Sequence, residues 1–249
     1  MTVPTPDPSR KGTTPPPPTR KRKTYDTADD APPIVNDDTW TKGDFALVSS
    51  DNVRFRVDLV HLLSASSVFR DMASVASAGG NRELHLTDDT MESSNVIKRF
   101  LFLLIDAEVD VEDLPGNFYH LVYLAQLVVK YDCRFLKTVL GFRIKDTINN
   151  GTPGVYTWVI GAIMDNTDLC MAAMYKPNQL WPLSAVPIDA MRTLPKVHCF
   201  NPHSFSYQWW SFIPQPYLWA LSRAWVLTGG LTAFAATFRD MLAEAKGNC

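Results

Sequence analysis

The chain has 249 residues, of which 46% are hydrophobic, and its formal net charge at pH 7 is −2. This balance predicts a folded core and argues against direct binding to nucleic acid or to an anionic membrane surface. The cysteines lie far apart without a Cys-x-x-Cys pair, and the polar, Pro-rich start has no apolar signal region. We therefore expect reduced thiols in the cytoplasm and/or nucleus, and no secretion.

Residues 1–39 form the first segment, and they carry half of the 18 prolines and almost no large apolar side chains. Such a segment buries too little apolar surface to offset the entropy of ordering, so we predict a disordered tail with order beginning near Trp40. Within it lies the basic run Arg20, Lys21, Arg22 and Lys23. This run is equally well interpreted as a nuclear import signal or as a solvated group of charges.

The next segment has the pattern of a β-hairpin. We predict one strand over Phe45–Ser49, a turn over residues 50–52, and a half-buried strand over Val53–Val57, where apolar and charged residues alternate. Helical spacing follows at once, and Ser66 or Ser67 can cap a second short helix. The apolar residues of these two helices are Leu59, Leu62, Leu63, Val68, Phe69 and Met72.

Longer helices follow a short third strand over Glu83–Leu86. Asp89 and Glu92 have the spacing of a capping box before a helix with inward positions from Ile97 to Leu104. The next helix is predicted over Phe118–Tyr131, with Leu121, Leu124, Ala125, Val128 and Val129 facing inward. Asp132 can cap the last helix of this group, whose apolar stripe is Leu136, Leu140, Ile144 and Ile148.

Residues 149–154 are the best domain boundary, being rich in Asn, Gly and Pro. A helical pair is predicted over Val155–Met164 and Asp168–Tyr175, followed by an ordered extended loop over residues 177–216 with seven prolines. The apolar run Tyr217–Phe238 has about the 20 residues of a membrane span. A charge and a glycine pair interrupt it, which favours two short buried helices over a span.

The order of these pieces resembles the BTB/POZ domain, most closely its fungal, basidiomycete-type branch. The resemblance covers roughly residues 43–148. The residues that carry it are Gly43-Asp44-Phe45, Phe55-x-Val57 with the two helices that follow, Arg99-Phe100-Leu101-Phe102, and Ala125 with Lys130-Tyr131-Asp132.

This resemblance implies an α+β fold with a BTB/POZ domain over residues 40–150, in which a small mixed sheet joins a helical cluster. A mostly helical C-terminal extension would then occupy residues 151–249. The family is a protein-interaction module, so the implied function is non-enzymatic protein–protein interaction through homo- or hetero-oligomerisation, without cofactor or small-molecule substrate. In many relatives the first helices form a twofold dimer, which makes the six apolar residues from Leu59 to Met72 the interface candidates. Some of the six must belong to the core, and the sequence does not divide core from interface.

Two departures from the family pattern bear on the partner. The His-Arg pair that follows the second strand in relatives is Asp58-Leu59 here, so we expect Asp44 to lack the Arg partner that joins it in the charged pocket of zinc-finger relatives. Cullin-binding relatives often carry a hydrophobic-x-acidic triplet where this chain has residues 94–96 (Ser-Asn-Val). An adaptor for a cullin ubiquitin ligase is weakened but stays open, and a nuclear transcription-associated BTB scaffold is the alternative.

A small metal-binding protein or enzyme is the least favoured alternative. It would use the loop from His198 to His203, with Cys199 and Cys170 as further ligands. Their spacing fits no standard zinc pattern, and a fourth ligand would have to be added. The sequence also has no nucleophile elbow, phosphate loop or His-Glu-x-x-His helix, so we predict no catalytic, cofactor-binding or metal-binding residue.

Overall fold

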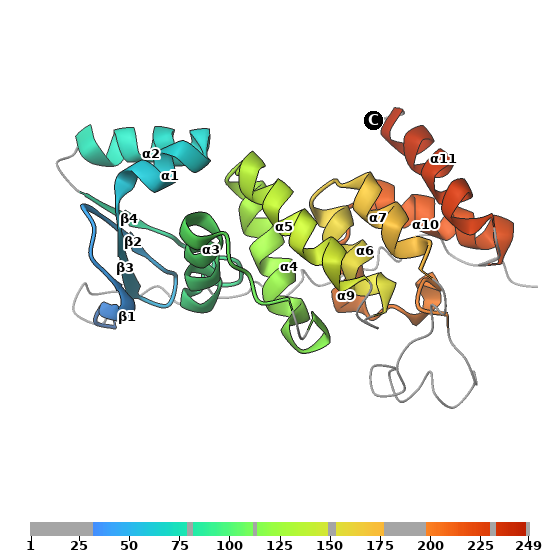
Figure 1. Cartoon of the computed structure of the whole chain (residues 1–249), viewed down its shortest axis with the longest axis horizontal. Coiled ribbons are helices and arrows are strands. Elements are labelled where there is room, and N and C mark those ends of the chain that lie inside the picture. Colours follow the sequence, from blue (N-terminus) through green and yellow to red (C-terminus); the bar gives the residue numbers. More distant parts are fainter. Residues whose placement is uncertain are drawn as a thin grey trace, which may run out of the picture. The chain divides into compact units, whose positions relative to one another are not determined.

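The computed structural model describes residues 32–78, 82–111, 114–148, 153–176, 198–229 and 233–247. Contacts divide the chain into two compact units at Pro33/Ile34, and every described element belongs to the second. Within the described residues this unit contains ten α-helices and one four-stranded mixed sheet (Figure 1). The predicted α+β class is confirmed.

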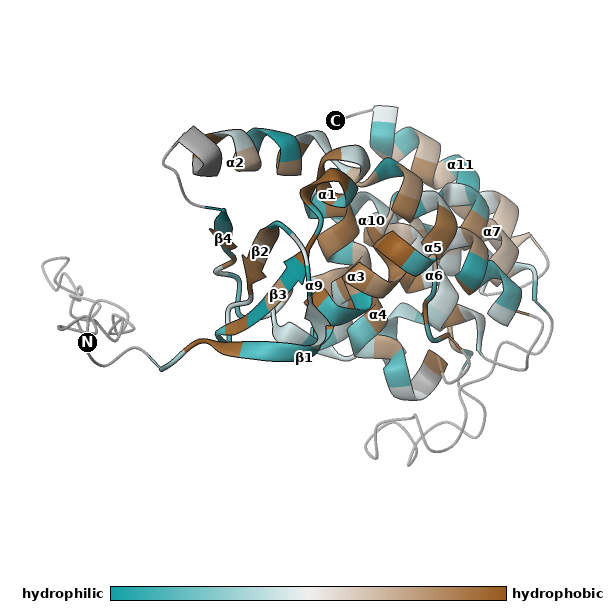
Figure 2. Ribbon diagram, turned by 60° about the vertical axis from the view of Figure 1, so that its left-hand side comes forward, coloured by the Kyte–Doolittle hydropathy of each residue, from teal (hydrophilic) through white to brown (hydrophobic). Residues whose placement is uncertain are grey.

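The sheet has the strand order β1-β3-β2-β4. Its strands are β1 (Val35–Thr41), β2 (Phe45–Val48), β3 (Val53–Val57) and β4 (Glu83–His85). β2 and β3 form the predicted antiparallel hairpin, while β1 runs parallel to β3 and β4 runs parallel to β2. Every residue of β2 is buried, and Figure 2 shows this strand as uniformly hydrophobic.

Strand β1 corrects the predicted extent of the disordered tail, because it occupies residues assigned to that tail. An edge strand needs backbone partners more than apolar residues, and Val35 N–H donates to the carbonyl of Asn52 at 2.9 Å. Trp40 packs edge-on against Phe102 with ring centroids 5.4 Å apart. The remainder of the predicted tail, including Arg20, Lys21, Arg22 and Lys23, lies outside the described residues.

Five helices belong to the same half of the chain as the sheet. They are α1 (Leu59–Ala65), α2 (Ser67–Ala78), α3 (Ser94–Asp106), α4 (Leu114–Lys130) and α5 (Arg134–Thr147). Ser66 caps α2 as predicted, since its hydroxyl accepts the N–H of Phe69 at 3.1 Å. The predicted inward stripes of α4 and α5 are buried except for Val129, which is 43% exposed near the end of α4, and Ile148, which is half-buried.

Two predicted helix caps are wrong. Helix α3 begins later than the predicted capping box, and Glu92 is a buried side chain of the loop before it. Asp88 makes side-chain-to-backbone hydrogen bonds in this loop instead. Its carboxylate accepts the N–H groups of Thr90 and Met91 at 3.0 Å. Asp132 has a left-handed backbone (φ 46°) and makes no capping bond to α5.

The second half of the described chain is helical. Its elements are α6 (Gly154–Ile163), α7 (Thr167–Met174), the 3-10 turn η2 (Pro202–Ser204), α9 (Tyr207–Phe212), α10 (Gln215–Thr228) and α11 (Phe234–Gly247). The predicted pair is confirmed as α6 and α7. The predicted extended loop is wrong at α9, where the Ser206 hydroxyl caps a helical turn by accepting the N–H of Trp209 at 3.3 Å. Residues 177–197 of that loop lie outside the described residues.

One hydrophobic core joins the two halves. Every residue of α6 is buried, and the Trp158 ring at its centre lies against Phe200, Tyr217 and Phe238. Phe118 of α4 stacks on Trp209 of α9 with centroids 4.5 Å apart. Residues 40–150 and 151–249 therefore share a continuous interior.

The apolar run Tyr217–Phe238 divides between α10 and α11, as predicted. None of the helices that the structure describes is long and apolar enough to cross a membrane. The prediction that both helices are buried holds only in part, because Val226 and Leu227 on α10 are exposed.

Candidate protein-interaction surface

The corner between α1 and α2 is fixed to the rest of the fold by polar contacts. Asp44, which precedes β2, accepts the first N–H of α1, that of Leu59, at 2.9 Å. The Ser66 hydroxyl donates to the carbonyl of Tyr131 at the end of α4. Arg70 of α2 donates to the carbonyl of Leu63 in α1 at 3.0 Å. These contacts hold the two short helices in one arrangement, and that arrangement decides which of their side chains face solvent.

Two of the six interface candidates belong to the core. Leu62 has no exposed surface, and Phe69 is 2% exposed. Phe69 stacks on Tyr131 with ring centroids 4.3 Å apart and also contacts Phe100. Both side chains lie on the inner side of the helices, where a partner molecule has no access to them.

The other four predicted residues are half-buried, and two exposed valines lie on the same helices. Val60 is 64% exposed and Val75 is 75% exposed. Both valines were missed in the sequence analysis. The available signal was that each is apolar but lies outside the set of apolar residues assigned to its helix. We define the α1–α2 face as these six side chains: Leu59, Val60, Leu63, Val68, Met72 and Val75. Most of α1 is hydrophobic in Figure 2.

Asp44 has a basic neighbour, which comes from a different part of the chain than the Arg found in relatives. Arg82, before β4, lies 3.8 Å from its carboxylate, with the two side chains 74% and 54% exposed. A long, exposed ion pair of this kind contributes little to stability. The more important role of Asp44 is to accept an N–H that the start of α1 would otherwise leave without an intrahelical partner.

The loop before α3 carries a buried carboxylate, Glu92, whose side chain is 3% exposed. One of its oxygens accepts the N–H groups of Thr87 at 2.8 Å and Asp88 at 2.7 Å. The other accepts the Lys130 ammonium at 2.7 Å and the Tyr131 hydroxyl. Burial acts to raise the pKa of Glu92, but these hydrogen bonds outweigh it and hold the pKa below its ordinary value. The network fixes Tyr131, the residue on which Phe69 stacks.

The residues of the metal-binding alternative have other roles. Cys170 is buried and donates to the carbonyl of Trp158 at 3.5 Å, and Cys199 is also buried. His198 accepts the N–H of Phe200 at 3.2 Å, and His203 is exposed. In the part of the chain that the structure describes, no three His, Cys, Asp or Glu residues gather where they could hold a metal ion.

The described cysteines are also poorly suited to nucleophilic chemistry. Cys133, Cys170 and Cys199 are buried thiols. Burial raises the pKa of Cys133 and of Cys199 to about 12. With pKa values this high, the thiols remain protonated near neutral pH. Because the reactive form of cysteine is the thiolate, they are weak nucleophiles.

No protein-family model matches the chain, and no curated protein or solved structure matches it either.

Proposed function

We propose that this chain is a non-enzymatic protein–protein interaction module of the BTB/POZ type, which associates through the α1–α2 face with a second copy or a related domain. The order of elements supports the proposal: a hairpin, two short helices, a short strand and three longer helices follow one another from Phe45 to Thr147. This is the order expected from the family resemblance.

The observation that carries the proposal is the exposure of Val60 on α1 and Val75 on α2, two helices that also carry four half-buried apolar side chains at the edge of the core. Full burial of one such side chain in a packed interface stabilises the complex by about 1.5–3 kcal/mol. A twofold interface uses each residue twice, so a small patch supports association. Buried thiols suit a reducing compartment, and the proposal places the protein in the cytoplasm and/or nucleus.

The substitution Leu59→Arg tests the proposal. Leu59 is half-buried at the first position of α1, where relatives of the resembled family carry Arg, so we expect the fold to accept the change. The charged side chain should weaken self-association by about tenfold or more, because it would have to be desolvated in the interface. Light scattering measures the mass over a concentration series, and circular dichroism checks the fold on the same samples.

Leu62→Ala, on the same helix, is the control for the effect of losing a core side chain. Leu62 is fully buried, so this change should lower the free energy of unfolding by about 2–5 kcal/mol through the cavity it leaves. A wild-type chain that stays monomeric throughout the series would remove the homodimer and leave only a heteromeric partner. Unfolding of Leu59→Arg would place Leu59 in the core and contradict the proposed face.

A further inference from the structure

Helix α5 is apolar on two opposite sides. Leu136, Leu140 and Ile144 are buried on the inner side, at most 1% exposed. Phe135 and Phe142 lie on the outer side and are 69% and 65% exposed. They are two helical turns apart, so their rings follow one line with about 10 Å between the backbone positions. A helix with apolar residues on both sides is normally covered on both, and α5 is covered on one.

These two rings are exceptions among the phenylalanines. The chain has 13 phenylalanines, all of which lie in the described ranges, and the other members of the set are buried or half-buried. A phenylalanine has no polar atom that could gain from contact with water. A single exposed apolar residue is ordinary, but two aligned aromatic rings on one helix mark a surface that a partner can cover.

The charge of α5 indicates the chemistry of that partner. The helix carries four basic residues, Arg134, Lys137, Arg143 and Lys145, and one acidic residue, Asp146. Arg134, Arg143 and Lys145 are exposed. Two of the cations already have contacts: Arg134 lies 3.4 Å from the carboxylate of Asp132, and Arg143 donates to the carbonyl of Ala107 at 3.4 Å. Both contacts are long and exposed, so an approaching carboxylate can compete with them.

We propose that α5 is a second docking face and that it binds an acidic amphipathic helix of another protein. Apolar residues two turns apart on the partner helix match Phe135 and Phe142, which is the usual spacing of anchors in helix recognition. Glutamate or aspartate beside those anchors meets the basic residues that flank the rings. Aromatic side chains and arginine are enriched at protein interfaces, and both occur here. The inference rests on α5 alone and does not require the α1–α2 face.

A designed peptide pair provides the probe. One labelled peptide is an amphipathic helix with leucine on one face and glutamate elsewhere, and its counterpart carries lysine in place of every glutamate. Fluorescence anisotropy with the full chain should show saturable binding of the glutamate peptide and none of the lysine peptide. The double change Phe135→Ser with Phe142→Ser should weaken binding by about tenfold or more, as loss of central aromatic anchors does.

Two further variants separate the apolar and the charged contributions. Val226→Ser alters a side chain on α10 that is 74% exposed, and it should leave binding unchanged. Arg134→Glu with Lys145→Glu should weaken binding and reduce its dependence on salt. All of these positions are exposed, so the thermal midpoints should stay close to that of the wild type.

Several outcomes would overturn the proposal. These are equal binding of the two peptides, no saturable binding of the glutamate peptide, or an affinity that the phenylalanine changes do not alter. Loss of self-association in the double phenylalanine variant would assign the face to a second copy of this chain instead of an acidic partner. Leu59→Arg should leave peptide binding intact, so failure at α5 is distinguishable from failure at the α1–α2 face.

Discussion

At the scale of single residues, Glu92 shows how a buried charge is made tolerable. Removing a carboxylate from water is costly unless hydrogen bonds replace its hydration, and Glu92 accepts four of them. Two come from backbone N–H groups of the loop after β4, and two come from Lys130 and Tyr131 at the end of α4. The carboxylate therefore ties together segments far apart in the sequence.

We predict that Glu92→Gln lowers the free energy of unfolding by about 2–4 kcal/mol at pH 7, because the amide cannot accept from all four donors. The pH dependence has a definite sign. The pKa of Glu92 in the folded chain lies below its ordinary value of 4.5, so its stabilisation is complete above that value and is lost as the pH falls through the lowered pKa. Urea unfolding at a series of pH values measures both effects.

The exposed Glu108 provides the control for that measurement. Glu108→Gln should follow the wild-type curve, while Glu92→Gln should be less stable at pH 7 and lose less stability on acidification. Equal acid sensitivity in the wild type and in Glu92→Gln would show that other carboxylates carry the effect.

At the scale of elements, the sequence predicted those whose periodicity is local and clear. The β2–β3 hairpin, the α6–α7 pair and the buried stripe of α5 follow directly from apolar spacing. Strand β1 and helix α9 were missed. β1 owes its place to backbone pairing and long-range contacts, and α9 depends on a serine cap within an aromatic, Pro-rich segment. Neither kind of contact has a periodic signature.

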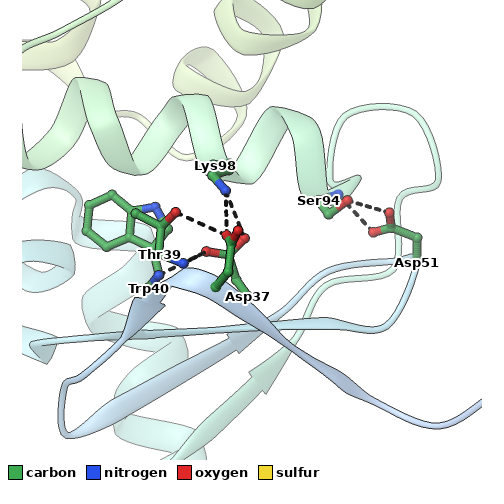
Figure 3. A network of polar contacts seen from close by, with 7 residues as sticks. Asp37, Thr39, Trp40, Asp51, Ser94 and Lys98 are labelled. Atoms are coloured by element: carbon green, nitrogen blue, oxygen red, sulfur yellow. Dashed lines mark hydrogen bonds and ion pairs between the residues drawn. The ribbon is translucent and has the colours of Figure 1, made fainter.

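Strand β1 is held by an ion-pair cluster that the sequence pattern does not reveal. Lys98 of α3 lies 3.2 Å from the carboxylate of Asp37 and 3.0 Å from that of Asp38. Figure 3 shows the Lys98 side chain directed towards Asp37. The hydrogen bond to Asp38 raises the pKa of Lys98, and the bond from Lys98 lowers the pKa of Asp38. In the same view Asp51, in the hairpin turn, accepts the N–H and hydroxyl of Ser94 at the start of α3.

We predict that Lys98→Met loosens β1 while the rest of the fold stays intact. Most of β1 is exposed, so without the ion pairs of Lys98 the strand has few side-chain contacts to the rest of the fold. Amide hydrogen exchange in residues 35–41 should become severalfold faster, with the exchange of β2 unchanged. Lys145→Met, which removes an exposed cation from α5, is the matched control. Unchanged protection of β1 in Lys98→Met would show that backbone pairing to β3 alone retains the strand.

At the scale of the whole molecule, the division between core and interface was the part that sequence could not supply. Leu62 and Val60 are both apolar residues of one short helix, yet one is fully buried and the other is 64% exposed. Their difference depends on how the α1–α2 corner is held against Tyr131, a residue far along the chain. The carbonyl of Tyr131 accepts the Ser66 hydroxyl, and its ring stacks on Phe69. Phe135 and Phe142 differ from this case, because the predicted inward stripe of α5 already places both on the opposite side of the helix.

The central claim is that the α1–α2 face is an interaction surface, and amide hydrogen exchange at two protein concentrations tests it most directly. We expect protection of residues 59–75 to increase at the higher concentration, since association buries this face, while exchange in α6 stays constant because α6 is already fully buried. Leu59→Arg should abolish the increase. Concentration-dependent protection located on other elements, with none on α1 and α2, would contradict the account.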